Sequence, residues 1–527
     1  MNYRNFLHLF LSNFLLIASN NIELPIGLSE EEKERIDEIH SMGRVTDPPP
    51  QPVRNVSEFE PMSGVLIRYP FGIPIELIEE MAQDVVVYCL VSSNQQNSAY
   101  NSMAGGNVNM DNVEFVIGST DSYWTRDYGP WWVIDGDRSV SVVDFTYNRP
   151  RPNDNNAPLK ISNHLDVPYF SADIIHCGGN YMTDGLGISA STDLVFEENN
   201  ISNEQVYDIM EDYYGIETYH VVPDPNNTYI DHIDCWGKYL SPTKVMIREV
   251  PNTHPQYNEI EEIANYFSNS TTNWNEPWEL YRVWTPSNQP YTNSMILNNK
   301  IFVPTTGSSW DEEALAVYSE SMPGYEVIGF NGSWESTDAL HCRVKGIPDL
   351  RMLQIFHNPL NDSIPPDSNG YKINVFIDDL SNAGLISDST KVFWKTNEID
   401  NWNSVPLFLS NEIENSNEWG GWIPALVDSS YIYYYIISAD SSGRVEHSPP
   451  AGWHKFFAYP TNACQEWLIG DLDNSGEINI IDVLLLADQI MYGSLTSNCS
   501  GFVSDINDDN QITLIDILLL INIISNP

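Results

Sequence analysis

The chain has few positive charges. It contains 24 Lys and Arg residues against 73 Asp and Glu residues, so its formal net charge is −49 over 527 residues. Such a chain would repel nucleic-acid phosphates, so the composition argues against a nucleic-acid partner. The same field favours solubility and attracts cationic substrates. Apolar residues are not lacking: 42% hydrophobic and 12% aromatic residues suffice for several cores, and the length predicts roughly three or four domains.

Long hydrophobic runs are also lacking, with one exception at the N-terminus. Arg4 precedes an apolar stretch over residues 6–17, and the small residues Ala18 and Ser19 follow it. This order is typical of a secretory signal peptide, and the stretch is too short to span a bilayer. A buried N-terminal helix is the alternative. We therefore expect a signal peptide over residues 1–20, no membrane span, and a secreted or cell-surface protein.

Cysteine is scarce as well, with six residues in the whole chain. Cys464 and Cys499 bracket the C-terminal region and could form a disulfide with each other, although six cysteines allow many other pairings. The remaining four are spread through the large N-terminal region, where they resemble buried small apolar residues or functional thiols: Cys89, Cys177, Cys235 and Cys342.

The pattern of elements divides the rest of the chain into three parts. A capping box at Ser29 and Glu32 predicts a helix that ends at Gly43, and a stiff linker follows at residues 47–52. Strand-like and helical segments alternate over residues 54–360, which predicts an α/β domain. Over residues 368–460 the helices cease and β-rich runs predict a small immunoglobulin-like β-sandwich. Residues 464–527 form a final small module.

The final module contains one motif twice. Calcium takes six to eight oxygens from a 12-residue loop, with ligands at positions 1, 3, 5, 7, 9 and 12. The sharp turn at position 6 falls on Gly476 in one copy and on Asn510, which tolerates a left-handed backbone, in the other. Two calcium ions are therefore expected, and their ligands are Asp471, Asp473, Ser475, Glu477, Asn479 and Asp482, then Asp505, Asn507, Asp509, Gln511, Thr513 and Asp516.

With Asp at position 12 and an apolar helix after each loop, this module resembles a type I dockerin. The resemblance implies a cohesin-type protein partner bound through the two helices. Positions 10 and 11, Ile480–Ile481 and Leu514–Ile515, are apolar where many dockerins are polar. A calcium-stabilised tail without a partner is therefore the alternative.

Four clusters in the α/β domain contain residues suited to chemistry. "YWTRDYGPWW" holds Asp127, "HCGGNYMTDGLG" holds a double glycine, "YIDHIDCWGKYL" holds His232 and Asp234, and "STDALHCRVKGIP" holds Cys342. On a strand, His232 and Asp234 would face the same side. A Cys, a His and two Asp predict a nucleophile, an acid/base and anionic binding groups, although each alone is usually structural. A metal site is the alternative, but no CxxC or HExxH spacing supports zinc.

These ordered motifs resemble the agmatine deiminase and Porphyromonas-type peptidylarginine deiminase branch of the guanidine-modifying enzymes. The resemblance implies a pentein fold, a five-bladed α/β-propeller of ββαβ-like blades, followed by an immunoglobulin-like domain. It implies catalysis without a cofactor. The catalytic positions would be Cys342, His232, Asp127, Asp234 and Asn293, and Trp124 and Tyr229 would contact the substrate.

The chemistry of a guanidinium fits these residues. The cation keeps its proton near neutral pH, and two carboxylates can align it by bidentate hydrogen bonds. A bound cation favours a thiolate at Cys342, which would attack the guanidine carbon. His232 would protonate the departing ammonia and then activate the water that hydrolyses the thiouronium intermediate. The product from arginine would be citrulline.

Two arginines in the run "DFTYNRPRPNDNN" bear on the substrate. The resemblance implies that Arg149 and Arg151 bind the α-carboxylate of an arginine, so we expect a preference for C-terminal peptidyl-arginine or free arginine. A surface pair answering Asp144 and Asp154 is the alternative interpretation. Agmatine, which has no carboxylate, is the alternative substrate and would yield N-carbamoylputrescine. A non-catalytic binding component of a calcium-dependent assembly is the alternative of a different class. The catalytic segment lacks the acidic clusters of the vertebrate enzymes, so we expect catalysis without calcium.

Overall fold

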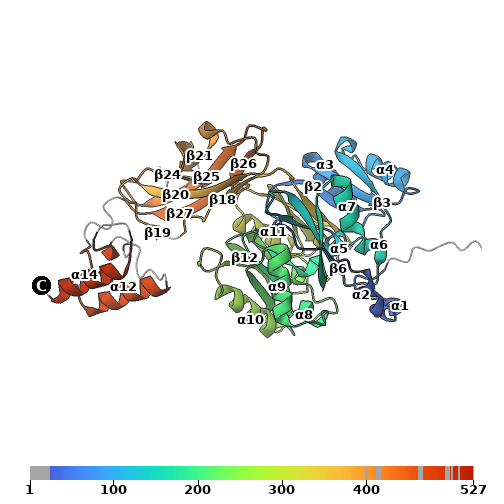
Figure 1. The fold of residues 1–527 in the computed structure, drawn as a ribbon, viewed down its shortest axis with the longest axis horizontal. Coiled ribbons are helices and arrows are strands. Elements are labelled where there is room, and N and C mark those ends of the chain that lie inside the picture. The colour runs from blue at the N-terminus through green and yellow to red at the C-terminus, as the bar shows by residue number, and fades with distance from the viewer. Residues whose placement is uncertain are drawn as a thin grey trace, which may run out of the picture.

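The computed structural model describes residues 24–361, 363–397, 401–410, 417–460, 467–492, 499, 503–507 and 511–525. Three units follow one another along the chain, an α/β unit, a β unit and a pair of helices near the C-terminus (Figure 1). The expected signal peptide, Cys464, Asp509 and Asn510 lie outside the described residues. No helix among the described residues is both long enough and apolar enough to cross a bilayer.

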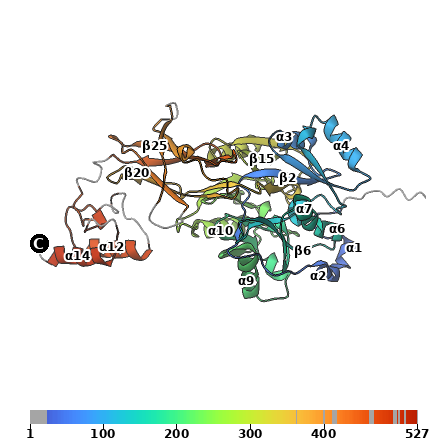
Figure 2. The same ribbon diagram turned by 45° about the horizontal axis from the view of Figure 1, so that its top comes forward.

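The N-terminal segment contains two single-turn helices, α1 (Glu30–Lys33) and α2 (Ile39–Met42), separated by the 3-10 turn η1 (Ile36–Glu38). The expected capping box is present, since Ser29 Oγ accepts from Glu32 N and Glu32 Oε2 accepts from Ser29 N. The expectation of one continuous helix up to Gly43 is wrong. The chain turns at Glu34 and Arg35, and α2 then packs against the first sheet (Figure 2).

Residues 54–348 form five small sheets that repeat one pattern. In each, two strands pair antiparallel and a further strand joins in parallel after a helical crossover. The sheets are β1 (Arg54–Asn55), β5 (Trp131–Ile134), β6 (Val140–Tyr147) and β7 (Tyr169–His176); β8 (Met182–Thr183), β9 (Ile188–Thr192) and β10 (Thr218–Val222); β11 (Gly237–Ser241), β12 (Lys244–Glu249) and β13 (Glu279–Trp284); β14 (Met295–Leu297), β15 (Lys300–Thr305) and β16 (Glu326–Asn331); and β17 (Lys345–Pro348), β2 (Met62–Arg68), β3 (Val86–Val91) and β4 (Val113–Ile117). Because β17 pairs with β2, the fifth sheet joins the two ends of this unit.

The crossover helices cover the sheets because each has one apolar face. In α9, for example, the buried side chains are Val206, Met210, Tyr213 and Tyr214, spaced three or four residues apart. The helices of this unit are α3 (Ile75–Asp84), α4 (Gln96–Gly105), α5 (Thr125–Tyr128), α6 (Pro152–Asn155), α7 (Ala157–Leu165), α8 (Leu194–Glu197), α9 (Asn203–Tyr214), α10 (Tyr257–Ser268) and α11 (Asp311–Ser321), with the 3-10 turns η2 (Met110–Asn112), η3 (Gly178–Asn180), η4 (Ile233–Cys235) and η5 (His341–Arg343).

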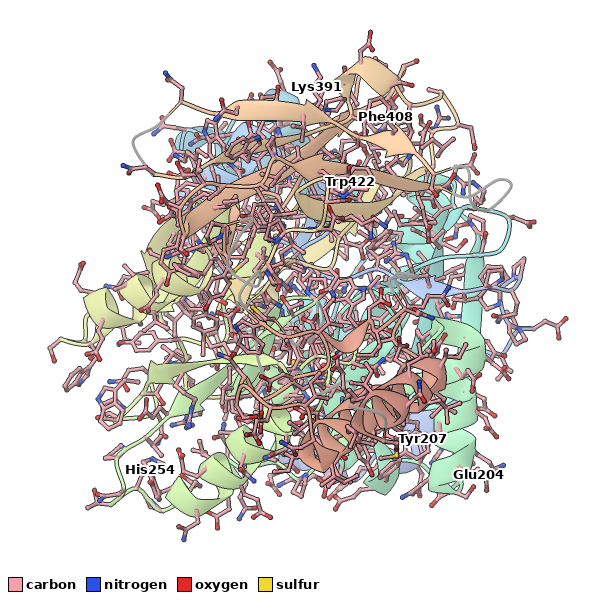
Figure 3. The ribbon with its side chains drawn as sticks, turned by 90° about the vertical axis from the view of Figure 1, so that its left-hand side faces the viewer. Glu204, Tyr207, His254, Lys391, Phe408 and Trp422 are labelled. Carbon is pink, nitrogen blue, oxygen red and sulfur yellow. The ribbon has the colours of Figure 1, made fainter. Side chains whose placement is uncertain are left out.

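The β unit consists of two sheets around one apolar core that includes Leu353, Ile373, Ile432 and Tyr434. One sheet contains β18 (Leu353–Phe356), β20 (Tyr371–Asp379), β24 (Glu418–Ile423) and β23 (Phe408–Leu409). The other contains β19 (Ser363–Ile364), β27 (His454–Ala458), β25 (Ser430–Ala439), β21 (Lys391–Lys395), β22 (Asn403–Pro406) and β26 (Val445–Ser448), and the 3-10 turn η6 (Ser387–Ser389) precedes β21. Strand β18 falls inside the range expected for the α/β domain, yet it pairs with β20. Phe408 and Trp422 of the four-stranded sheet are exposed (Figure 3).

The C-terminal unit contains helices α12 (Ile480–Tyr492) and α14 (Leu514–Ser525), which pack against each other beside the β unit (Figure 1). Leu472, Val483, Leu486, Val503 and Leu520 form its small core. Cys499 takes part in a disulfide. The core holds few residues, so a unit of this size depends on such covalent or metal crosslinks for stability.

Candidate active site

Four short helical turns meet inside the α/β unit, and each contains one of the motifs singled out in the sequence. Turn α5 contacts both η3 and η5, and η3 contacts η4. The fold thereby brings together side chains that are as far apart in the sequence as Asp127 and Cys342. The expectation that His232 and Asp234 lie on one strand is wrong, because residues 233–235 form the 3-10 turn η4. His232 has an extended backbone and precedes that turn, whereas Asp234 lies within the turn. The side chains of both residues reach the same cluster.

Gly179 lies at the centre of this cluster. A Cβ atom at this position would lie 2.6 Å from Asp127 Oδ1, 2.7 Å from His232 Nδ1 and 3.4 Å from Asp234 Oδ2. Any side chain at residue 179 would therefore fill the space among the three groups. This close approach is the physical reason for the glycine in the "GGN" segment.

The Cys342 thiol completes the cluster. Its Sγ lies 3.6 Å from Asp234 Oδ2 and accepts a hydrogen bond of 3.2 Å from Asn293 Nδ2. Asn293 Oδ1 also accepts from the backbone N–H groups of His341 and Cys342, which fixes the turn that carries the thiol. Cys342 is fully buried and forms no disulfide. Burial and the neighbouring carboxylates of Asp234 and Asp127 raise the pKa of this thiol well above its ordinary value.

The two aspartates differ in their surroundings. Asp127 is buried, and neither of its carboxylate oxygens has a hydrogen-bond partner among the described residues. Burial and the charge of Asp234 raise the pKa of Asp127 well above its ordinary value. Burial also disfavours the charged form of Asp234, but a 2.7 Å hydrogen bond from His341 Nδ1, together with the charges of His341, His232 and Arg126, lowers the pKa of Asp234. Asp127 is thus a buried acceptor without a donor.

His232 is the basic group of the cluster. Its Nδ1 lies 3.9 Å from Asp127 Oδ1 and 4.0 Å from Cys177 Sγ, while none of the described residues forms a hydrogen bond with its Nε2. Burial lowers the pKa of His232 to about 4, so the ring is neutral near pH 7. Asp127, Cys177 and His232 also place one possible metal ligand each within 4.8 Å of one another.

A buried charge network lies behind Asp234. Glu58 Oε2 is 2.6 Å from His341 Nε2 and 2.7 Å from Arg126 Nη2, and Glu58 Oε1 is 2.6 Å from Lys238 Nζ. Burial opposes ionisation of Glu58, but these three groups hold the pKa of Glu58 well below its usual range. A cavity of about 60 Å³ is lined in part by Glu58, Lys238 and Asp234. The sequence analysis missed Glu58, because nothing in its local sequence distinguishes it from a surface carboxylate.

Three of the four residues expected to contact substrate, namely Arg149, Arg151 and Tyr229, contact the N-terminal segment. Arg149 Nε donates to Ile26 O at 3.1 Å, and Arg151 donates through Nε to Glu32 Oε1 at 2.7 Å. The Arg151 guanidinium also lies 5.2 Å from the centre of the Trp124 ring. The exposed ring of Tyr229 lies against Gly27 of the same segment.

The interpretation of these arginines as an exposed pair answering Asp144 and Asp154 is wrong. Both arginines are buried, at 6% and 1% exposure. Asp144 instead accepts a hydrogen bond from Tyr169. Asp154 accepts from the hydroxyl and backbone N–H of Ser122 and from the backbone N–H of Asp121.

A much larger cleft, of about 2620 Å³, lies elsewhere in the molecule. It runs between the α/β unit and the β unit, and its lining includes Glu60, Trp274 and His454. Neither Cys342 nor His232 lines it. This cleft is therefore separate from the cluster that contains Cys342 and His232.

The first expected calcium loop places three carboxylates together. Oxygens of Asp471, Asp473 and Asp482 lie within 4.8 Å of one another, and Gly476 has φ +85° at the sharp turn, as the sequence predicts. In the second loop, Asp516 is buried and accepts from the backbone N–H groups of Ile506 and Thr513. Asp482 occupies the matching place in the first loop, accepting from Leu472 and Asn479. The described ligands therefore fit a hard cation that takes oxygen ligands.

Comparison with known proteins agrees with this geometry. Residues 469–525 match the dockerin type I domain. The agmatine deiminase of Medicago truncatula is 25% identical over 300 residues, which cover 46% of this chain and 79% of that protein. The structure of an agmatine deiminase of Enterococcus faecalis superposes with a TM-score of 0.52 at 18% identity, covering 58% of this chain and 99% of that one. Residues 73–348, more than half of the chain, match the family described as Porphyromonas-type peptidyl-arginine deiminase. The chain therefore belongs to the Porphyromonas-type peptidyl-arginine deiminase family.

Proposed function

We propose that the α/β unit hydrolyses the guanidine group of an arginine, preferentially a C-terminal one, to a ureido group and ammonia. The observation that carries the proposal is Asp127, a buried carboxylate whose two oxygens accept no hydrogen bond from the described residues, beside His232 and in the same cluster as Cys342. A buried acceptor without a partner is costly unless a ligand supplies the donors. A planar guanidinium, with five N–H donors, is such a ligand.

Substrate binding would prepare the nucleophile. In the free site the pKa values of Cys342 and Asp127 are both raised, because burial and mutual repulsion disfavour negative charge. A guanidinium held between Asp127 and Asp234 adds a positive charge, which favours the carboxylate and the thiolate. The ionised state of the carboxylate and the thiolate is therefore stabilised only while the cation is bound.

The proton then moves through His232. The thiol of Cys342 gives its proton to the neutral ring of His232, and the thiolate attacks the guanidine carbon to form a C–S bond. As the C–N bond breaks, the protonated ring of His232 transfers that proton to the departing ammonia. The ring next takes a proton from water, whose oxygen attacks the same carbon. Cys342 leaves as the restored thiol, and the product is a ureide such as citrulline.

Arg149 and Arg151 support the preference for a carboxylate-bearing substrate. Both guanidinium groups are buried, the Arg151 guanidinium lies against the Trp124 ring, and Nη1 of Arg151 has no hydrogen-bond partner in the part of the chain that the structure describes. Agmatine is the second candidate substrate. The ion pair between Arg151 and Glu32 favours it, because an arginine whose charge is already balanced has less to offer a carboxylate.

The test is product formation from three substrates: a dipeptide ending in arginine, free arginine and agmatine. We expect ureido product and ammonia with wild-type protein, none with Cys342→Ala, and the same rate with and without a chelator. A Cys342→Ala protein that keeps the wild-type rate would exclude this function. A higher kcat/KM for agmatine than for the dipeptide would assign the second substrate instead.

The remaining properties form one proposal about assembly. In this proposal, residues 1–20 direct export. The five sheets close into a propeller, and the β unit is an immunoglobulin-like sandwich. Two calcium ions hold the C-terminal loops. A cohesin-type protein would bind the C-terminal helices, where Ile480, Ile481, Leu514 and Ile515 are exposed at equivalent positions of the two repeats. Size-exclusion chromatography with a cohesin module, with and without calcium, tests this proposal.

A further inference from the structure

The chain's own N-terminal segment occupies the place proposed for the substrate carboxylate. Three successive carbonyl groups face the two arginines. Arg151 Nη2 donates to Pro25 O at 2.7 Å and to Gly27 O at 2.9 Å, while Arg149 Nε donates to Ile26 O at 3.1 Å. The segment therefore meets both arginines with the acceptor groups that a peptide or a carboxylate would present.

Glu32 adds a carboxylate to these carbonyl groups. Its two oxygens accept from Arg151 Nε at 2.7 Å and from Arg151 Nη2 at 3.1 Å, a bidentate geometry. The exposed fractions are 4% for Glu32 and 1% for Arg151, so solvent does not screen the pair. The capping box at Ser29 fixes Glu32 in this position. Nη1 of Arg151 is buried and finds no acceptor among residues 24–361 or the other described residues, so residues 24–32 leave part of the guanidinium unsatisfied.

Apolar contacts hold the same segment over the cluster. Ile26 is 3% exposed and belongs to the apolar core that also contains Trp124 and Cys342. Gly27 lies so close to the ring of Tyr229 that a Cβ atom there would be 2.6 Å from a ring carbon. Residues 24–32, which we call the N-terminal strap, thus contact three of the four residues expected to bind substrate outside the guanidine pocket, namely Arg149, Arg151 and Tyr229.

We infer that the N-terminal strap is an internal ligand of the Arg149–Arg151 subsite, and that Glu32 competes with the carboxylate of the substrate. The inference rests on the proposed function and adds the regulation of its substrate site. The exchange is balanced in charge, because one carboxylate replaces another beside Arg151. Only the fraction of molecules with the strap displaced can bind an arginine carboxylate, so the apparent affinity is reduced by that fraction. Removal or displacement of the strap activates the enzyme toward arginine.

Glu32→Gln tests the inference, because it removes the charge and keeps the size of the side chain. Glu31→Gln is the matched control, since Glu31 is the exposed neighbour in the same helical turn. We expect the KM for a dipeptide ending in arginine to fall about tenfold in Glu32→Gln, the scale of one lost charge-assisted hydrogen bond, and to stay unchanged in Glu31→Gln. An unchanged KM in a folded, active Glu32→Gln protein would overturn the inference.

A second variant displaces the strap without changing charge. The side chain of Gly27→Val would meet the Tyr229 ring, so we expect the same fall in KM. Hydrogen exchange of residues 24–33 in the full chain gives a readout independent of turnover. Free arginine should accelerate this exchange and agmatine should not. If no guanidine substrate is turned over, the proposed function fails by itself. Accelerated exchange with arginine would still support the strap as a ligand, and unchanged exchange would overturn it.

Discussion

Asn293 joins the nucleophile to the backbone that carries it. Its Nδ2 donates to Cys342 Sγ at 3.2 Å, and its Oδ1 accepts from Cys342 N at 3.3 Å and from His341 N at 2.9 Å. Asn293→Ala removes these three contacts and a longer one of 3.5 Å, in which Nδ2 donates to Asp234 O. His341 N keeps a second acceptor, the backbone oxygen of residue 293 at 3.1 Å, whereas the backbone N–H of Cys342 loses its acceptor.

The size of the effect follows from these contacts. A buried N–H without an acceptor costs about 1–3 kcal/mol, so we expect the free energy of unfolding to fall by that amount in Asn293→Ala. The hydrogen bond to sulfur strengthens when Cys342 becomes a thiolate, and a bond to a charged group contributes about 1.5–3 kcal/mol. Its loss should lower kcat roughly ten- to a hundredfold.

Asn298→Ala provides the control. Asn298 clamps the backbone of Met62 in a similar way, with Oδ1 accepting from Met62 N at 2.8 Å and Nδ2 donating to Met62 O at 3.0 Å, away from the thiol. We expect a comparable loss of stability in denaturant unfolding and an unchanged kcat. The rate of Cys342 alkylation is also measured as a function of pH. An Asn293→Ala protein with reduced stability but a kcat within about twofold of wild type would refute the role of the amide in supporting the thiolate.

Three further predictions follow from the same structure. Burial and the neighbouring carboxylates raise the pKa of Cys342, so the thiol of the free enzyme loses its proton only toward alkaline pH. We therefore expect kcat/KM to rise with pH through the neutral range, and a falling profile would contradict this prediction. Burial lowers the pKa of His357 to about 4, so the contribution of its neutral ring to stability is complete above about pH 6.5 and is lost as pH falls toward 4. Over this pH range, the free energy of unfolding of the wild-type protein, measured with denaturant, should fall by up to about 3 kcal/mol more than that of His357→Gln. Asp482→Ala or Asp516→Ala should abolish calcium-dependent gain of helix by circular dichroism, as a chelator should in wild type, while ammonia release stays unchanged.

Local signals in the sequence predicted local structure well. Ser202 and Gln205 form a capping box at the start of α9, and Gly215 ends that helix with φ +65°. Ser29 and Glu32 form theirs too, because a capping box needs only residues three apart. The break in the helix between Ser29 and Gly43 was not predictable, because packing of α2 on the first sheet decides where the chain turns.

The candidate site was recognisable from its motifs, and its electrostatics were not. Asp127, His232 and Asp234 meet at Gly179, and Cys342 Sγ lies 3.6 Å from Asp234 Oδ2. The partner of Asp234 is His341, which in turn depends on Glu58, a residue 283 positions earlier in the chain. No periodicity or motif connects residues so distant.

The sequence by itself determined which chemical groups the protein has and which short segments must turn, cap or bind a cation, because those properties depend on residue types a few positions apart. Only the tertiary structure decided which of these groups are charged and which are already occupied. Burial raises the pKa of one aspartate while a histidine from another turn lowers that of its neighbour. Burial likewise turns Arg151 from a free cation into the partner of Glu32, because a charge removed from water must find its counter-charge wherever the fold supplies one.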